Sequence, residues 1–331
     1  MFNVFLITLN KILTYICIVL IDALIYKGMG KNVLITGGTG FIGRYLTKEL
    51  VKKGYTVSIL TRNSKPNTES VAYYIWDVDT QSIEESSVGS ADYIIHLAGE
   101  NIAEEKWTAK RKDAIRDSRT KSSQLIYDTL KKLNKRVDVF VSASGIGYYG
   151  SVNGEGICTE STLPANDFVG TVCQEWEKSA DLMAGLGIRT VKIRTGLVLG
   201  KNEGILKKLS PIFKRGLGSA LGSGKQYMPW IHVHDLCMMY IEAIENIKMS
   251  GPYNATINDS TTNLIFSKEL ANSYGFSMWL PNVPAFVIRL MLGERSSLLL
   301  TGRRVSSDKV KKLGFRFQFK NLKKTLKDTL K

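Results

Sequence analysis

A glycine-rich loop near the start of the chain carries the clearest chemical signal. Residues Thr36–Gly43 read TGGTGFIG and follow a short apolar run that is typical of a buried strand. Apolar residues at helical spacing begin at Phe41. Early glycines let a backbone turn tightly against a pyrophosphate, and Gly43 lets the helix pack close to the strand. We therefore predict a dinucleotide site at the helix N-terminus, formed by Gly37, Gly40, Phe41, Ile42 and Gly43.

The end of the second strand distinguishes between the two nicotinamide cofactors. An acidic side chain at that position would bind the ribose 2′-hydroxyl of NAD. This chain instead has Thr61 and Arg62 there, and the stretch Leu60–Lys65 contains no carboxylate. A guanidinium can form charge-assisted hydrogen bonds with a 2′-phosphate. The sequence therefore favours NADP(H) over NAD(H), unless Arg62 is an ordinary surface arginine.

The loop belongs to a regular alternation of strands and helices. Strands are expected at 32–36, 56–60, 73–76, 93–97, 137–141 and 190–193, with helices at 41–53, 107–133 and 168–183. This alternation predicts an α/β fold with a Rossmann-type, doubly wound parallel sheet covered by helices on both faces. After Gly200 the alternation fades. We expect an NAD(P)-binding Rossmann domain over 29–262 and a smaller, α-rich C-terminal domain on the substrate side over 263–331.

Residues 1–28 form an apolar N-terminal extension. Its core, Ile12–Ile21, is shorter than the run of about 20 apolar residues that a membrane-spanning helix needs. Met29 stands directly before the first strand, so we interpret it as the true start, or the extension as dispensable. A membrane anchor is the alternative, and without it no membrane partner is expected.

The overall composition narrows the choice of partners. The 331 residues carry a formal net charge of +15, with 45 Lys+Arg against 30 Asp+Glu. No zinc spacing, RNA-binding aromatic motif or helix-turn-helix pattern accompanies this charge, so nucleic acid is not an expected partner. The four cysteines and three histidines lack the spacing of a metal site. Unpaired cysteines favour a reducing, cytoplasmic compartment.

Further motifs lie along the rest of the chain: HLAGENI at 96–102, GYYG at 147–150, RTGLVLG at 194–200, WIHVHDL at 230–236 and GRRV at 302–305. Together with the glycine loop, they make the chain from Lys31 onward similar to extended short-chain dehydrogenases/reductases. Within that group the chain resembles the NAD-dependent epimerase/dehydratase-like branch of sugar-nucleotide epimerases, which ends in a small domain of unknown function.

The resemblance implies cofactor contacts by five more residues: Asp77, Leu97, Ala98, Gly99 and Arg119. The residues that end the fourth strand would lie beside the adenosine ribose and pyrophosphate, and Asp77 near the adenine. Arg119 would reach the phosphates or ribose, unless it forms a salt bridge on the helix surface. Glu100 and Asn101 follow the same strand, so we expect them to touch the nicotinamide ribose or a substrate hydroxyl.

The catalytic residues of the family are only partly present. Active members of the superfamily use a tyrosine, a lysine four residues later and a serine, and Ser144 matches the serine. Phe168 and Val172 stand at the tyrosine and lysine positions, and neither side chain can transfer a proton. Tyr148, or its neighbour, is the candidate replacement acid or base, although aromatic packing under the substrate loop would also explain it. The stretch Glu175–Glu177 is expected to form a helix face that packs its one aromatic residue inward.

Two functions fit these observations. The first is an NADP(H)-dependent oxidoreductase or epimerase-like enzyme that acts on a small carbonyl substrate, either polyhydroxylated or nucleotide-linked. The second is a non-catalytic NADPH-binding sensor or regulatory module, which the missing tyrosine and lysine would favour. The family resemblance further implies a homodimer formed through the long helix that ends near Leu133.

Overall fold

The computed structural model describes residues 30–151 and 153–330. The N-terminal extension over residues 1–28, interpreted above as dispensable or as an anchor, lies outside these ranges. Within them, no helix combines the length and the apolar character needed to cross a bilayer.

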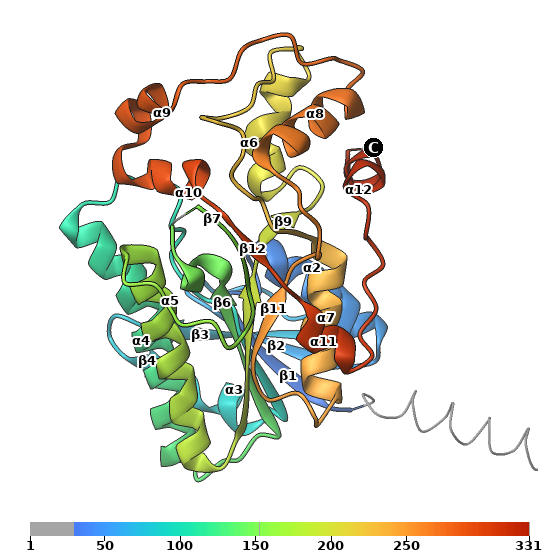
Figure 1. Cartoon of the computed structure of the whole chain (residues 1–331). Helices are drawn as coiled ribbons and strands as arrows, with labels where there is room; N and C mark the ends of the chain where they lie inside the picture. Colours follow the sequence, from blue (N-terminus) through green and yellow to red (C-terminus); the bar gives the residue numbers. More distant parts are fainter. Residues whose placement is uncertain (1–29, 152, 331) are drawn as a thin grey trace, which may run out of the picture.

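A large sheet forms the centre of the molecule (Figure 1). In the described ranges it has eight strands, in the spatial order β11-β8-β6-β5-β1-β2-β3-β4. Their bounds are β1 Asn32–Thr36, β2 Thr56–Thr61, β3 Val71–Asp77, β4 Ser82–Ile83, β5 Tyr93–His96, β6 Val139–Gly145, β8 Arg189–Thr195 and β11 Gly251–Ala255. All of them pair in parallel except β4, which joins β3 antiparallel at the edge. The predicted Rossmann-type parallel sheet is confirmed.

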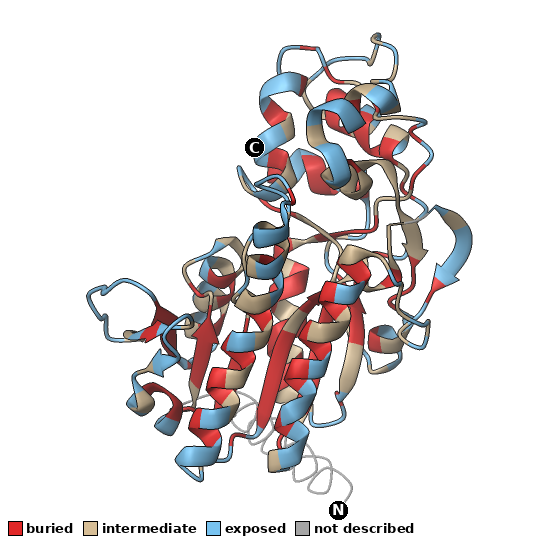
Figure 2. Cartoon of the chain, turned by 90° about the vertical axis from the view of Figure 1, so that its left-hand side faces the viewer, coloured by how far each residue is buried: buried red, intermediate tan, exposed pale blue. Residues whose placement is uncertain are grey.

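Helices cover both faces of this sheet (Figure 1). One face carries α2 (Phe41–Lys52) and α7 (Val233–Glu245); the other carries α3 (Glu85–Gly89), α4 (Ala109–Lys132) and α5 (Phe168–Asp181), which continues into η2 (Leu182–Leu186). Neighbouring residues of β1 point to opposite layers. Ile35 belongs to the core cluster that includes Leu50 of α2, whereas Leu34 belongs to the cluster that includes Ile126 of α4. Figure 2 shows the result, a buried sheet between helices whose outer faces are exposed.

The alternation of helix and strand continues beyond Gly200, so the prediction that it fades there is wrong. Helix α7 buries Leu236 and Tyr240, and β11 then pairs in parallel with β8. Strand β11 contains Pro252, which cannot donate a hydrogen bond to a neighbouring strand. Proline is tolerated there because β11 is the outermost strand of the sheet. A short GPYNA segment therefore forms a strand without the apolar pattern of an interior one.

Most of the remaining elements gather where the parallel strands end (Figure 1). They are η1 Ile146–Tyr149, β7 Gly154–Cys158, β9 Leu197–Leu199, α6 Gly204–Phe213, β10 Trp230–His232, α8 Asn263–Ser273, α9 Ala285–Leu292, η3 Gly293–Ser296, α10 Ser297–Leu300, β12 Arg303–Val305 and α12 Leu322–Thr329. Strand β9 pairs with β10, and β12 pairs with β7. A further short helix, α11 (Asp308–Lys312), lies beside β11.

The C-terminal segment shares its core with the helix layer below it. Leu322 and Leu326 of α12 belong to the same core cluster as the buried residues of α7. The buried Asp235 carboxylate on α7 accepts the backbone N–H groups of Gln318 (2.8 Å) and Phe319 (2.9 Å). These contacts attach the segment after the predicted boundary at 262/263 to the Rossmann part.

Candidate functional site

The glycine loop lies where the order of strands in the sheet reverses. Strand β1 has β2 on one side and β5 on the other, and the loop after Thr36 leads directly into α2. In open parallel sheets, ligands bind in the crevice at this switch point, outside the carboxyl ends of the strands. The fold therefore places the loop at the expected position for a ligand site.

The backbone of the loop is packed too closely for side chains at two of its glycines. Gly37 has a positive φ of 68°, and a Cβ there would lie 2.9 Å from the carbonyl carbon of Leu97. A Cβ on Gly43 would lie 2.4 Å from the carbonyl oxygen of Gly37. The N–H of Gly40 donates to that same oxygen at 3.0 Å and closes the turn. A side chain at Gly37 or Gly43 would therefore disrupt this tight turn between β1 and α2; the contact of these glycines with a cofactor stays a prediction.

Helix α2 begins directly at this loop, with Gly40 as its N-cap and no capping side chain among the described residues. The first backbone N–H groups of the helix, including those of Phe41 and Ile42, are therefore available to an anion. The Phe41 ring itself packs on Gly200, where a Cβ would lie 2.5 Å from a ring carbon. Phe41 thus contributes its backbone to the loop, while its side chain fixes α2 against the segment after β9.

A chain of buried hydrogen bonds holds the end of β5 against β1. Thr36 Oγ1 accepts the N–H groups of Leu97 and Ala98, both at 3.1 Å, so its proton is left for His96 Nδ1 at 2.7 Å. Nδ1 is then an acceptor, and Nε2–H donates to Ser122 Oγ of α4 at 3.1 Å. Burial lowers the pKa of His96 to about 4, in keeping with a neutral ring. No feature of the sequence predicted a role for this histidine.

Arg119 is buried next to the same strand end. Its guanidinium donates to the carbonyl oxygens of Ile115 (2.6 Å) and Glu100 (2.9 Å), and it stacks on Trp176 with its Cζ 4.7 Å from the ring centroid. A Cβ on Gly99 would lie 3.1 Å from the guanidinium carbon. The alternative of a surface salt bridge is wrong, because the side chain is buried and its hydrogen bonds go to carbonyl oxygens and to the Ser118 hydroxyl. Its Nε has no hydrogen-bond partner within the described ranges, which suits an anionic ligand.

Glu100 and Asn101 lie in the loop that follows β5, and their side chains have partners there. Arg111 of α4 donates to Glu100 Oε2 at 3.1 Å and to the Asn101 carbonyl oxygen at 2.9 Å. The Asn101 amide also donates to Glu104 at 2.8 Å. Glu100 and Asn101, the predicted substrate residues, therefore form the edge of the site beside the glycine loop, which we call the rim. Arg111 fixes both residues there through its hydrogen bonds.

Thr61, Arg62 and Asp77 lie at the ends of the next two strands. Thr61 ends β2, the neighbour of β1, and its hydroxyl donates to the Asn63 carbonyl oxygen at 3.2 Å. Arg62 follows it and is exposed. The exposed Asp77 carboxylate ends β3, and backbone N–H groups of Thr80 and Asp79 lower its pKa by hydrogen bonding. No acidic side chain stands at the end of β2.

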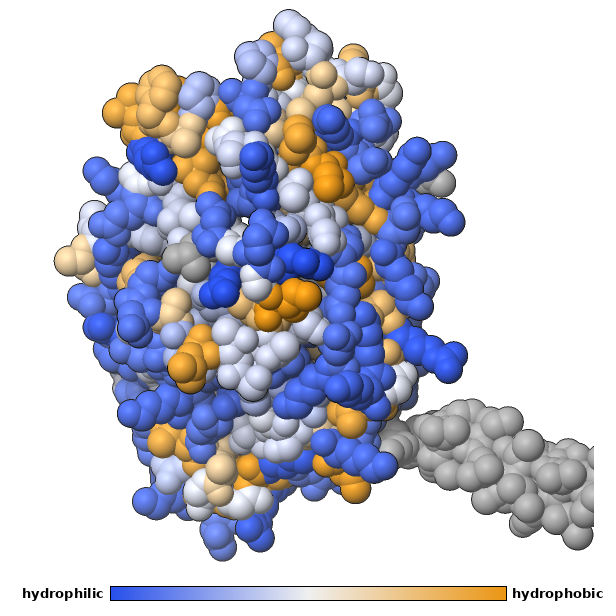
Figure 3. Space-filling model, in the orientation of Figure 1, coloured by the Kyte–Doolittle hydropathy of each residue, from blue (hydrophilic) through white to orange (hydrophobic). Residues whose placement is uncertain are grey.

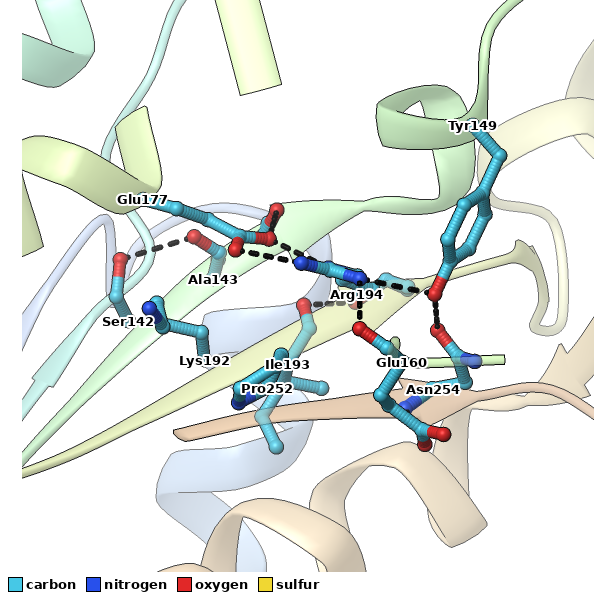
Figure 4. Close-up of polar contacts among 12 residues, drawn as sticks. Ser142, Ala143, Tyr149, Glu160, Glu177, Lys192, Ile193, Arg194, Pro252 and Asn254 are labelled. Atoms are coloured by element: carbon cyan, nitrogen blue, oxygen red, sulfur yellow. Dashed lines mark hydrogen bonds and ion pairs between the residues drawn. The ribbon is translucent and has the colours of Figure 1, made fainter. Parts of the chain in front are cut away.

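Ser144 belongs to a separate buried cluster. Its hydroxyl donates to Glu177 Oε1 at 2.8 Å, and Glu177 binds Arg194 through two hydrogen bonds of 2.7 and 2.9 Å. Arg194 also donates to the Tyr149 hydroxyl at 3.0 Å, which donates to Asn254 Oδ1 at 2.7 Å (Figure 4). Burial alone would lower the pKa of Arg194, but the Glu177 carboxylate raises it above its ordinary value. The cluster links α5, β6, β8, η1 and β11.

The cluster limits what the predicted catalytic residues can do. The Ser144 hydroxyl already donates its proton in a hydrogen bond to Glu177. Burial raises the pKa of Tyr149 to about 12, so its hydroxyl stays protonated near neutral pH. Tyr148 differs, because no hydrogen bond of its hydroxyl occurs among the described residues, while the Arg194 guanidinium lies 3.5 Å from its ring centroid. Phe168 packs edge-on against Trp107, 4.8 Å between ring centroids. The cluster therefore holds the tyrosine ring but offers no cation at the lysine position.

Glu177 and Arg194 are the polar residues that sequence reasoning missed. The helix face 175–177 does pack Trp176 inward as expected, but Glu177 is buried beside it. The signal was Arg194, a charged residue near the carboxyl end of an interior strand of the sheet. A buried charge requires a partner, and Glu177 on the neighbouring helix supplies it.

The switch point and the close-packed glycine loop define a nucleotide-binding α/β protein of the Rossmann type. Residues 33–256 match the NAD dependent epimerase/dehydratase family, and residues 283–329 match a domain of unknown function, DUF1731. The chain belongs to the NAD dependent epimerase/dehydratase family.

Several relatives share nearly the whole chain. The epimerase family protein YfhF of Bacillus subtilis is 33% identical over 291 residues, covering 88% of this chain and 95% of its own. The chloroplastic epimerase family protein SDR39U1 homolog of Arabidopsis thaliana is 34% identical, covering 89% and 86%. The crystal structure of human epimerase family protein SDR39U1 (isoform 2) with NADPH is 28% identical, with a TM-score of 0.79 and coverage of 90% and 98%.

Proposed function

We propose that this chain binds NADP(H) at the glycine loop and acts as an oxidoreductase or epimerase-like enzyme on a small carbonyl substrate. The observation that carries the cofactor choice is the end of β2, where exposed Arg62 follows Thr61 and no carboxylate is present. A guanidinium there suits a 2′-phosphate, whereas NAD would favour an acid. The human relative whose structure contains NADPH supports the same choice.

The residues around the loop fit such a cofactor. The first N–H groups of α2 would bind the pyrophosphate, and the close packing at Gly37 and Gly43 keeps the backbone accessible to it. Leu97 and Ala98 would lie along the ribose, and Arg119, with its unpaired Nε, would face the phosphates. Asp77, at the end of β3, is proposed near the adenine. The bound nicotinamide would supply hydride chemistry.

The substrate side is proposed to lie between the rim of Glu100 and Asn101 and the cluster that contains Ser144. Because Ser144 donates its proton to Glu177, it can only accept a hydrogen bond from a substrate hydroxyl. Tyr148 is the hydroxyl left to donate a proton, and Arg194 holds its ring. A polyhydroxylated or nucleotide-linked carbonyl compound suits this set of polar groups.

A second candidate function is a non-catalytic NADPH sensor. Two observations favour it. The Ser144 hydroxyl donates its proton to Glu177, and Phe168 and Val172 stand at the family's tyrosine and lysine positions. In that case the same cofactor contacts would stabilise a binding state without turnover.

Turnover across a panel of sugars, nucleotide sugars and simple carbonyl compounds decides between the two functions. It must be followed both as oxidation of NADPH and as epimerised product separated by chromatography, because epimerisation returns the hydride to the substrate and consumes no NADPH. The enzyme proposal predicts turnover of at least one compound, which Tyr148→Phe abolishes while NADPH affinity stays unchanged. The matched control adds Phe168→Tyr to the Tyr148→Phe variant. This substitution places a hydroxyl at the family's tyrosine position without a lysine partner, so it should not restore the activity that Tyr148→Phe removes. Absence of turnover on the whole panel, with intact NADPH binding, would support the sensor.

A further inference from the structure

Large apolar side chains are exposed together on the segment from the end of α8 to the end of α9. The exposed fractions are 71% for Trp279, 69% for Phe286, 85% for Leu290 and 74% for Met291. We call these four residues the α9 surface. Figure 3 shows apolar residues at the upper left of the molecule, where Figure 1 places α9. Large apolar side chains exposed in such a group are typical of an interaction site.

The geometry of α9 explains why these side chains point outward. Ile288 is buried and anchors one face of the helix to the protein. Phe286 and Leu290 are one turn apart on the other face, and Met291 lies next to Leu290. Helix α9 therefore uses Ile288 to pack against the protein, while Phe286, Leu290 and Met291 remain exposed to solvent.

A strongly basic segment adjoins the α9 surface. Residues 204–225, which comprise α6 and the loop after it, contain no carboxylate. They carry five exposed cations: Lys207, Lys208, Lys214, Arg215 and Lys225. The Trp279 indole donates to the Gly216 carbonyl oxygen at 3.0 Å, and a Cβ on Gly216 would lie 2.9 Å from the Phe276 ring. The Gly222 N–H also donates to the Val283 carbonyl oxygen at 2.8 Å, so the basic segment lies against the stretch that leads into α9. Arg289 of α9 adds a further exposed cation.

We propose that the α9 surface and the basic segment together bind an anionic lipid bilayer from one side. Exposed aromatic and aliphatic residues insert at the boundary between headgroups and acyl chains, while neighbouring lysines and arginines are attracted to anionic lipids. Charge complementarity selects this partner, because cations without any carboxylate suit a surface of uniform negative charge. The surface lies at the end of the molecule opposite to the start of the parallel strands (Figure 1), so the sheet would stand away from the bilayer.

Co-flotation of the full chain with vesicles tests the proposal. Vesicles of phosphatidylcholine with phosphatidylglycerol should carry the protein upward at low salt, and vesicles of phosphatidylcholine alone should carry much less. Leu290→Asp should weaken binding about tenfold or more, since a buried leucine contributes at least that factor. Ile247→Asp is the matched control: Ile247 is 81% exposed but lies outside the α9 surface, and its replacement should leave binding unchanged.

A second pair of variants tests the charge contribution. Lys214→Glu with Arg215→Glu should weaken binding by about fivefold or more per residue. Lys48→Glu with Lys131→Glu changes the net charge equally on other exposed positions and should have a smaller effect. Since no cofactor enters these assays, their result is independent of the proposed enzyme function.

Three results would overturn the proposal. The first is that the folded wild type does not bind anionic vesicles. The second is that Leu290→Asp binds as well as Ile247→Asp, which would assign binding to another part of the chain. The third is that Leu290→Asp changes the oligomeric state measured by light scattering while the wild type ignores vesicles, which would make the α9 surface a contact between copies of this chain.

Discussion

Replacing Glu177 with glutamine tests the buried cluster most severely. Glu177 and Arg194 are almost completely buried, and two short hydrogen bonds of 2.7 and 2.9 Å join them. Glutamine keeps the shape but removes the charge, so the Arg194 guanidinium is left buried with only neutral partners. Removing one member of a buried ion pair destabilises a protein by about 3–5 kcal/mol. Because the amide still offers one acceptor, we expect a loss near 3 kcal/mol, at the lower end of that range.

Urea unfolding followed by tryptophan fluorescence measures this loss. Glu175→Gln on the same helix is the control, because Glu175 is partly exposed and its contact with Arg116 is 3.8 Å long. Exposed ion pairs contribute at most about 1 kcal/mol, so this variant should unfold almost like the wild type. The double variant Glu177→Leu with Arg194→Met should be more stable than Glu177→Leu alone, since it leaves no unpaired charge. Equal unfolding midpoints for Glu177→Gln and Glu175→Gln would refute the reasoning.

Two further predictions concern the glycine loop and the histidine beside it. Gly43→Ala should abolish cofactor binding in a fluorescence titration, because its Cβ would lie 2.4 Å from the Gly37 oxygen; Gly89→Ala, with nothing within 4 Å, should bind normally. Unchanged affinity in Gly43→Ala would contradict the close packing. His96 has a folded pKa of about 4 against an ordinary 6.5, so the unfolded chain takes up its proton first and stability falls as pH drops through this window. His96 alone should contribute roughly 3 kcal/mol to this fall, measured by urea unfolding between these pH values. The fall should shrink in His96→Asn, while the contribution of His232, whose pKa burial also lowers to about 4, remains.

Local patterns in the sequence were enough to predict the parallel sheet and the glycine loop. The role of Gly43 depends on a contact with Gly37, which is only a few residues away in the sequence. The strands and helices could be predicted because the spacing of apolar residues indicates which side chains are buried. The edge strand β11 escaped prediction because its position relaxes the rules that an interior strand obeys.

The polar clusters could not be predicted because they join distant elements. The Thr36–His96–Ser122 chain joins β1, β5 and α4, and Glu177 meets Arg194 only once α5 packs on β8. Each residue alone resembles an ordinary polar position. Burial, which only the fold reveals, makes each partner necessary.

The central claim, that the glycine loop binds NADP(H) with Arg62 on the 2′-phosphate, is tested most directly by calorimetric titration of the full chain with NADPH and NADH. We expect NADPH to bind more tightly, and Arg62→Ala to weaken NADPH by roughly 1.5–3 kcal/mol, about tenfold or more, without changing NADH. Lys65→Ala removes a nearby cation that lies over the Tyr73 ring and should leave the preference intact. Equal affinity for the two nucleotides in the wild type, or an NADPH affinity that Arg62→Ala leaves unchanged, would contradict the account.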